Sequence, residues 1–164
     1  MLIVIACAIV MSGEYVPKKQ VSNRMSACVE VATRAKLAKL DPILLMSISW
    51  IESRFDRRAV SNAGAVGLLQ ILPKYFCPRR KLKNCDTIEA GLKAWATWRK
   101  TVKSDREALC RYNGGWRCGR RSRHYARAVI RTRQKVTASR LWQIAYRFHT
   151  ICADMFFWGD RWRN

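Results

Sequence analysis

Residues 41–55 read DPILLMSISWIESRF, an apolar stretch that opens on Asp-Pro and carries one carboxylate near its end. Asp41 is a good helix N-cap and Pro42 fits the first helical position, so the pair predicts a helix start. The helix is expected to run to about Arg54. Its predicted core-facing positions are Leu45, Ile48 and Ile51 or their neighbours.

Glu52 is the residue of this helix best suited to chemistry. Trp50, Ile51 and Phe55 flank it, so its carboxyl group is expected to be partly desolvated. Desolvation penalises the anion and raises the pKa, which suits a general acid working near neutral pH. The alternative is an ordinary carboxylate at a helix end, paired with a nearby arginine. The arginines within reach are Arg54, Arg57 and Arg58.

Apolar residues also recur at helical spacing in the rest of the chain. No segment alternates apolar and polar residues between turns, which is the pattern of a half-buried strand. A chain of 164 residues, 49% of them hydrophobic, suffices for one compact domain with a sizeable core. The sequence therefore predicts a single all-α domain. The other expected helices cover residues 26–40, 68–72, 87–102, 105–111, 123–134 and 138–155, with loops at 61–67 and 77–86.

The chain begins with an apolar leader at residues 1–13, a candidate signal sequence, followed by a polar linker at 14–24. The leader lacks a basic residue before its apolar run and a clear A-x-A cleavage site, both usual in export signals. One alternative is a buried segment that packs on the domain. Another is a weak uncleaved anchor, although so short a run does not cross a bilayer comfortably. Export is the favoured interpretation.

Seven cysteines favour a domain stapled by disulfides, and removal of the leader would leave an even number of them. Free thiols are one alternative. A zinc site is another, but no C-x-x-C occurs and the chain has two histidines, so no metal is expected. The simplest pairing joins Cys77 to Cys85, Cys110 to Cys118 and Cys28 to Cys152.

The chain is strongly basic, with 32 Lys and Arg against 11 Asp and Glu and a formal net charge of +21. Such a surface favours an anionic polymer: nucleic acid, teichoic acid, lipopolysaccharide or peptidoglycan carboxylates. The charge is densest over residues 111–147, which hold ten arginines and Lys135 but no acid. Charge alone does not choose among these partners.

Four motifs that occur in a fixed order limit the number of candidate functions. ESRF at 52–55 is followed by AVSNAGAVGLLQ at 59–70, RYNGG at 111–115 and YARAV at 125–129. Together they resemble the soluble lytic transglycosylase (SLT) family, peptidoglycan-cleaving enzymes with a lysozyme-like fold. The pattern of that family is roughly E-S-x-F, A-x-S-x-x-G-A-x-G-L-M-Q, A-Y-N-A-G and Y-V-x-x-V. The resemblance covers about residues 25–133.

Two positions depart from the family pattern. Leu69 stands where the family has Met, a swap of similar volume that we expect to be tolerated. Gly115 and Trp116 stand where the family has Ala-Gly. The second departure is expected to change the shape of one side of the substrate groove.

The resemblance implies a mechanism with one carboxyl group and no cofactor. Glu52 would protonate the glycosidic oxygen between MurNAc and GlcNAc and then accept the proton of the MurNAc C6 hydroxyl, which closes a 1,6-anhydro ring. Ordinary glycosidases use a second carboxylate. The residues expected to bind substrate are Ser61, Gln70, Tyr112, Asn113 and Tyr125. Their ordinary alternatives are helix capping for the asparagine and core packing for the tyrosines.

The resemblance places a catalytic domain at residues 25–135, before a basic and aromatic C-terminal helix and tail at 136–164. It implies peptidoglycan strands as partner and export to the periplasm or the cell exterior, or a virion location for a phage protein. A secretion, conjugation or phage assembly is a further expected partner. The Arg-rich half is expected to bind anionic wall polymers or a membrane surface, and nucleic acid is not expected as the physiological partner.

Two other functions stay open at this point. One is a muramidase-type hydrolase of the same fold, and the other is a non-enzymatic protein that binds polyanions such as cell wall or nucleic acid. For the aromatic and basic segment 155–163, three interpretations compete: insertion at a membrane interface, docking on a partner, and folding back over the core, which is slightly favoured.

Overall fold

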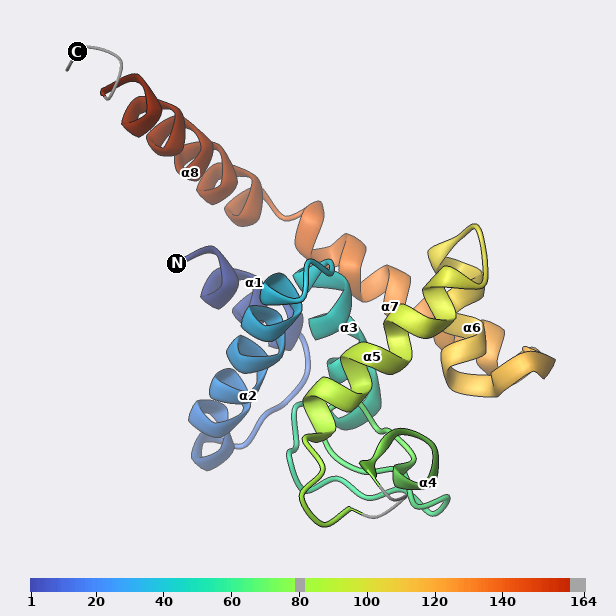
Figure 1. Cartoon of the computed structure of the whole chain (residues 1–164). Coiled ribbons are helices and arrows are strands. Elements are labelled where there is room, and N and C mark those ends of the chain that lie inside the picture. The colour runs from blue at the N-terminus through green and yellow to red at the C-terminus, as the bar shows by residue number, and fades with distance from the viewer. Residues whose placement is uncertain (79–81, 160–164) are drawn as a thin grey trace.

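The computed structural model describes residues 1–78 and 82–159, with side chains described up to residue 149. It is an all-α domain without a strand in those residues, which confirms the predicted fold class (Figure 1). The helices are α1 (Leu2–Met11), α2 (Lys18–Leu37), α3 (Pro42–Ser53), α4 (Pro73–Phe76), α5 (Thr87–Lys100), α6 (Asp105–Gly114), the 3-10 turn η2 (Gly115–Arg117), α7 (Arg120–Thr137) and α8 (Arg140–Gly159).

Helix α3 lies at the centre of the domain, in contact with α1, α2 and α7 (Figure 1). The Asp41 carboxylate accepts the N–H groups of Ile43 and Leu44 at 2.8 and 3.1 Å, which confirms the predicted N-cap. Every residue from Leu44 to Trp50 is buried. A helix that is apolar on all sides has to be surrounded by other elements, so α3 organises the packing of its neighbours.

Most of the other predicted helices exist with their ends moved by at most four residues, but two predictions fail: the helix expected at 68–72 is absent, and the one expected at 26–40 begins eight residues earlier, at Lys18. The predicted helix at 68–72 is wrong, because Gly67 and Gln70 have φ of 73° and 46° and the chain forms a turn there. The predicted linker 14–24 is shorter than expected, since α2 already begins at Lys18. Pro17 precedes it directly, and no helix breaker follows within the segment.

Three disulfides staple the domain, and two of them confirm the predicted pairing. These are Cys77–Cys85 and Cys110–Cys118, each with a sequence separation of 8. The predicted bond between Cys28 and Cys152 is wrong, because Cys28 is bonded to Cys7. Helices α1 and α2 pack together and bring these two Cα atoms within 5.9 Å. Cys152 lies outside the residues whose side chains are described.

Residues 1–13 pack on the domain in this structure through one face of α1, as in the alternative of a buried N-terminal segment. Ala6, Cys7, Val10 and Met11 are buried, and α1 contacts α2, α3, α7 and α8. Loss of this segment would remove half of a disulfide together with part of the core. In the described part of the chain, no helix combines the length and the apolar character needed to span a membrane.

Helix α8 extends away from the body of the domain (Figure 1). Its first half packs on α1 and α7, with Ala145 buried and Trp142 partly buried against the core. Leu141, Ile144 and Phe148 remain more than half exposed. The side chains of the aromatic segment 155–163 lie outside the described residues.

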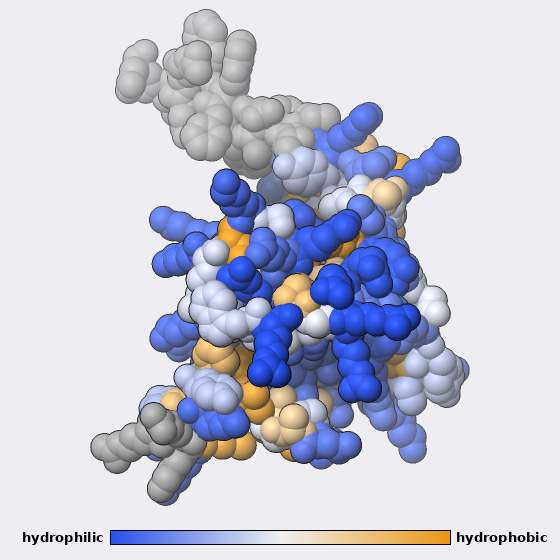
Figure 2. Space-filling model, turned by 90° about the vertical axis from the view of Figure 1, so that its right-hand side faces the viewer, coloured by the Kyte–Doolittle hydropathy of each residue, from blue (hydrophilic) through white to orange (hydrophobic). Residues whose placement is uncertain are grey.

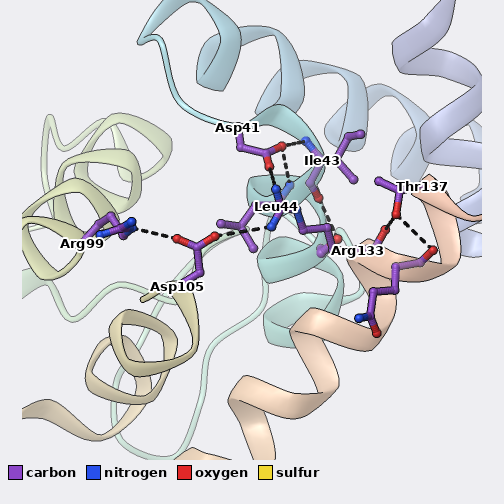
Figure 3. Close-up of polar contacts among 9 residues, drawn as sticks. Asp41, Ile43, Leu44, Arg99, Asp105, Arg133 and Thr137 are labelled. Carbon is purple, nitrogen blue, oxygen red and sulfur yellow. Dashed lines mark hydrogen bonds and ion pairs between the residues drawn. The ribbon is translucent and has the colours of Figure 1, made fainter. Parts of the chain in front are cut away.

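A chain of ion pairs joins four helices on one side of α3 (Figure 3). Arg133 of α7 contacts Asp41, the N-cap of α3, at 2.6 Å and Asp105 of α6 at 3.4 Å. Asp105 also accepts Arg99 Nε of α5 at 2.7 Å. Asp41 therefore caps its own helix with one oxygen and anchors α7 with the other.

We expect Arg133→Ala to lower the free energy of unfolding by about 1 kcal/mol, because partly exposed ion pairs are individually weak but this guanidinium serves two carboxylates. Arg133→Lys should recover only part of the loss, since an ammonium does not reproduce the planar fork of arginine. Urea denaturation with the disulfides intact measures both. The control is Arg131→Ala, an exposed position on the same helix. Equal stability of Arg133→Ala and the control would contradict a stabilising role.

Candidate active site

Glu52 lies in the last turn of α3, and the chain leaves the helix directly after it. Arg54 and Phe55 have left-handed backbones with φ of 53° and 60°, which costs strain in residues other than glycine. Arg54 Nη1 donates to the Trp50 carbonyl oxygen at 2.8 Å, and buried Phe55 packs on Trp50 with ring centroids 5.3 Å apart. These contacts hold the abrupt helix end that positions Glu52.

The arginines close to Glu52 in sequence bind other carboxylates. Arg54 Nε pairs with Glu14 at 2.8 Å, and Arg57 Nη1 pairs with Glu30 at 2.5 Å. Within the described residues no ion pair reaches Glu52. The alternative of an ordinary helix-end carboxylate paired with a neighbouring arginine therefore does not hold.

Burial determines the protonation state of Glu52. Desolvation raises the pKa of its carboxyl group from 4.5 to about 7, and the nearby Tyr125 hydroxyl opposes this shift to a smaller extent. The desolvation predicted from the flanking apolar residues is thus confirmed. A carboxyl group with this pKa is still partly protonated at neutral pH, which is the state that a general acid requires.

Two tyrosines from other helices surround Glu52. The Tyr112 hydroxyl of α6 donates to the Leu69 carbonyl oxygen at 2.7 Å. The Tyr125 hydroxyl of α7 is buried and has no hydrogen-bond partner of normal geometry in the described part of the chain. Burial and the negative charge of Glu52 raise the pKa of both tyrosines well above 10. Both hydroxyls therefore stay protonated and serve as neutral donors.

The segment 59–71 forms a compact loop against the end of α3. The Gly67 N–H donates to the Ala59 carbonyl oxygen at 2.9 Å, and an isolated bridge closes the turn that follows. Ser53 Oγ donates to the Leu68 carbonyl oxygen at 3.1 Å. Because Ser53 is the neighbour of Glu52, this hydrogen bond joins the loop to the end of α3 that carries Glu52.

Two predicted substrate-binding residues also shape this loop. Ser61 Oγ accepts the N–H of Ala65 at 3.0 Å. Gln70 Nε2 donates to the carbonyl oxygens of Ala59 and Gly67, both at 3.0 Å. The Gln70 amide oxygen has no hydrogen-bond partner in the described part of the chain. Sequence reasoning missed these loop contacts, and a substrate role for Ser61 and Gln70 stays a prediction.

Gly91 lets α5 approach the loop closely, a role that sequence reasoning missed. A Cβ atom at this position would lie 2.5 Å from side-chain atoms of Leu69. The carbonyl oxygen of the same Leu69 accepts the hydrogen bond from the Tyr112 hydroxyl. A glycine inside an otherwise good helix usually has a packing reason, and this signal was available in the sequence.

The sequence model of the transglycosylase SLT domain matches residues 30–135. The chain belongs to this family. The match contains Glu52, the loop 59–71 and both tyrosines, so the residues that converge in the structure are those of the SLT domain. No curated protein and no solved structure matches the chain. The activity of the family is lytic-transglycosylase-type cleavage of peptidoglycan.

A small hollow of about 60 Å³ lies between the loop 59–71, α4, α5 and α6, and Glu52 is not among the residues that line it. Tyr112 and Gln70 both line it, so two of the predicted binding residues share one cavity. Asn113 is exposed beside Tyr112, whereas Ser61 does not line the hollow. The complete lining is Gln70, Ile71, Leu72, Phe76, Ala94, Trp98 and Tyr112. Trp98 is partly exposed here, although its spacing from Trp95, which is buried, is that of one helical face.

Glu52 is the one carboxyl group that the described residues bring to the site formed by the end of α3, Tyr112 and Tyr125. In the part of the chain that the structure describes, no other carboxylate shifts the pKa of Glu52. Asp56, the nearest acid in sequence, is exposed, and its carboxylate accepts the N–H of Arg58 at 2.9 Å. The described residues also contain no cluster of three or more His, Cys, Asp and Glu side chains that would hold a metal ion.

We expect Glu52→Gln to stabilise the fold at alkaline pH. Between pH 4.5 and about 7 the carboxyl group ionises in the unfolded chain but not in the folded one, so wild-type stability falls as the pH rises through this range. Above pH 7 the full penalty, about 3 kcal/mol, applies. The variant should exceed the wild type by about that amount at pH 8 and match it at pH 4.

Urea denaturation at pH 4 and pH 8, with the disulfides intact, measures this difference. Glu89→Gln is the matched control, because this exposed carboxylate pairs with Lys93 on the surface of α5. A pH-independent difference between the wild type and Glu52→Gln would contradict a desolvated carboxylate.

Proposed function

We propose that the protein is a peptidoglycan lytic transglycosylase that cleaves the β-1,4 bond between MurNAc and GlcNAc and leaves 1,6-anhydro-MurNAc. The observation that carries this proposal is the isolated Glu52 carboxyl group, with a pKa of about 7 and with Tyr112 and Tyr125 beside it. Hydrolytic glycosidases position a second carboxylate roughly 5–10 Å from the first. A site with one carboxyl group favours a reaction in which that group acts twice.

The proposed reaction uses the two protonation states of Glu52 in succession. The protonated carboxyl group donates its proton to the glycosidic oxygen, the bond from this oxygen to MurNAc C1 breaks, and GlcNAc leaves with a free 4-hydroxyl. The carboxylate then takes the proton of the MurNAc C6 hydroxyl, whose oxygen bonds to C1. Glu52 ends protonated, as it began, and no water is consumed. A pKa near neutrality suits both steps, because neither state is strongly favoured.

The tyrosines support the same proposal in two ways. The Tyr125 hydroxyl lowers the pKa of Glu52, so it favours the carboxylate that the second step needs. The Tyr112 hydroxyl already donates to the Leu69 carbonyl oxygen, so its role is to hold the loop beside the carboxyl group. Asn113 and the free Gln70 amide oxygen remain for hydrogen bonds with sugar hydroxyl and N-acetyl groups.

A digest of purified peptidoglycan, with products read by mass spectrometry, tests the reaction. We expect anhydro-muropeptides, each one water lighter than the hydrolysis product and resistant to borohydride reduction. Glu52→Gln should remove this activity while wall binding persists. Reducing-end products would instead show a muramidase-type hydrolase. Binding without products in the wild type would indicate a non-enzymatic wall protein.

The pH dependence of turnover tests the roles of Glu52 and Tyr125. We expect kcat/KM to fall about tenfold per pH unit above pH 7, because the general acid becomes deprotonated. Tyr125→Phe should move this alkaline limb to higher pH, since removal of the hydroxyl raises the pKa of Glu52 further. Initial rates on soluble peptidoglycan fragments measure the limb, with Tyr15→Phe, an exposed tyrosine, as the control. An unmoved limb in Tyr125→Phe would contradict the proposed coupling.

We also propose that the protein works outside the cytoplasm, in the periplasm, at the cell exterior or on a virion. The support is the set of three disulfides, since such bonds persist in oxidising compartments. A secretion, conjugation or phage assembly that has to pass the wall is the proposed setting. The inclusion of Cys7 in a disulfide favours retention of the N-terminal segment there.

The basic surface supports a second part of the proposal, binding to anionic wall polymers or a membrane surface. The side of the molecule turned to the viewer in Figure 2 is covered mainly by hydrophilic side chains. Exposed arginines of η2 and α7 supply much of the charge: Arg117, Arg120, Arg121, Arg123, Arg127 and Arg131. Surface charges of this kind attract polyanions in a salt-dependent manner.

We expect a triple variant with Gln at positions 120, 121 and 127 to sediment less with cell-wall sacculi, with the largest loss at low salt. Turnover on short soluble fragments should stay within about twofold of wild type, because these side chains lie outside the Glu52 cluster. Pelleting assays at several salt concentrations measure the loss. The control is a triple variant with Gln at Lys18, Lys19 and Lys36, exposed on α2. Equal losses in both variants would show that binding follows net charge and has no preferred face.

A further inference from the structure

The most prominent aromatic group outside the Glu52 cluster is a pair of tryptophans at the rim of the hollow. Trp116 of η2 is 72% exposed and is the one exposed tryptophan among the residues whose side chains are described. Its ring contacts Trp98 of α5, with centroids 5.1 Å apart and planes at 75°. Trp98 also lines the hollow that Gln70 and Tyr112 share. The pair therefore continues the wall of the site out to the surface.

The position of Trp116 is held from several sides. The Cys110–Cys118 disulfide closes the segment that carries it, and the turn itself depends on Gly115 at φ of 62°. The Arg111 guanidinium lies over the ring, 5.0 Å from its centroid. The cross-linked turn fixes the ring of Trp116 in place, so a ligand that binds it loses little free energy in ordering the side chain.

We propose that the exposed ring of Trp116, supported by the nearly perpendicular ring of Trp98, forms a stacking platform for a sugar of an N-acetylated β-1,4 glycan strand, on the same strand as the bond that Glu52 cleaves. Pyranose rings have apolar C–H faces, and an exposed indole offers a flat apolar surface with a polar edge for the neighbouring hydroxyls. Trp98 and Tyr112 line the same hollow, and Tyr112 lies close enough to Glu52 for the charge of the carboxylate to affect it. The platform and the carboxyl group are therefore linked through Tyr112, and the proposal is that one glycan strand contacts both.

In the aligned segments RYNGG and A-Y-N-A-G, Gly114 and Gly115 occupy the Ala-Gly positions, so the assignment of those positions to Gly115 and Trp116 is wrong and Trp116 directly follows the motif. The platform depends on this tryptophan and not on the residues of the SLT motifs. The platform proposal takes its ligand class, glycan strands, from the proposed function, but it does not depend on which reaction the site catalyses. Trp98 and Trp116 carry no group that transfers a proton near neutral pH. Their expected effect is on substrate affinity, and the chemical step should be unchanged.

The test measures binding of chito-oligosaccharides and of short peptidoglycan fragments to the full chain carrying Glu52→Gln, so that turnover does not interfere. We expect the added Trp116→Ala change to weaken binding about tenfold and Trp116→Tyr to restore most of it. In the active enzyme, Trp116→Ala should raise KM by a similar factor and leave kcat within about twofold. Circular dichroism checks that the fold is kept.

Phe148→Ala is the matched control, because Phe148 is a similarly exposed aromatic residue on α8, which packs on α1 and α7. Its binding should equal that of the parent. Unchanged affinity in Trp116→Ala would overturn the platform while leaving the transglycosylase proposal intact. Weakened binding alongside reducing-end products would support the platform and overturn the proposed reaction. Absence of binding by the parent itself would overturn both the platform and glycan as the substrate class.

Discussion

The structure depends on one constraint: a carboxyl group is kept in an apolar environment at the end of a helix that is buried on every side. Residues 44–50 of α3 are buried. The side chains that cover this helix, and that surround Glu52 at its end, come from elements distant in sequence. Burial of a carboxylate costs free energy of folding, and the rise of the Glu52 pKa to about 7 reflects this cost. The ion pairs of Arg133, the disulfide-bonded α1 and the packing of α7 offset it.

Much of this arrangement was predictable, because its determinants are local. Asp41 and Pro42 specify where α3 begins, and the apolar neighbours of Glu52 specify its desolvation. The small residues of 61–67 predict a loop by composition, and equal spacing predicts two of the three disulfides. Each inference needs only residues within about two helical turns of each other. The family motifs assigned Tyr112 and Tyr125 to substrate binding, and only the assembled fold places them beside Glu52.

The remaining features depend on contacts between distant segments. Cys28 bonds to Cys7 because α1 packs on α2, and nothing in the spacing of the cysteines distinguishes this bond from one to Cys152. The helix expected at 68–72 is replaced by a turn that Gln70 stabilises through its own side chain. Trp98 has the helical spacing of a core residue. Its exposure follows from the hollow beside it, which only the assembled fold creates.

Under the proposed function, the requirements of chemistry and of glycan binding fall on different parts of this fold. The carboxyl group, its tyrosines and the loop that orients them are tightly coupled by burial and hydrogen bonds, so a change at one of them alters the protonation equilibrium of Glu52. The turn at Gly115 and Trp116 is bound to the body through one disulfide and a few ring contacts. A residue there changes the surface that a glycan meets without reaching the carboxyl group. Substrate preference can therefore vary at the rim, while the reaction is constrained by the cost of burying Glu52.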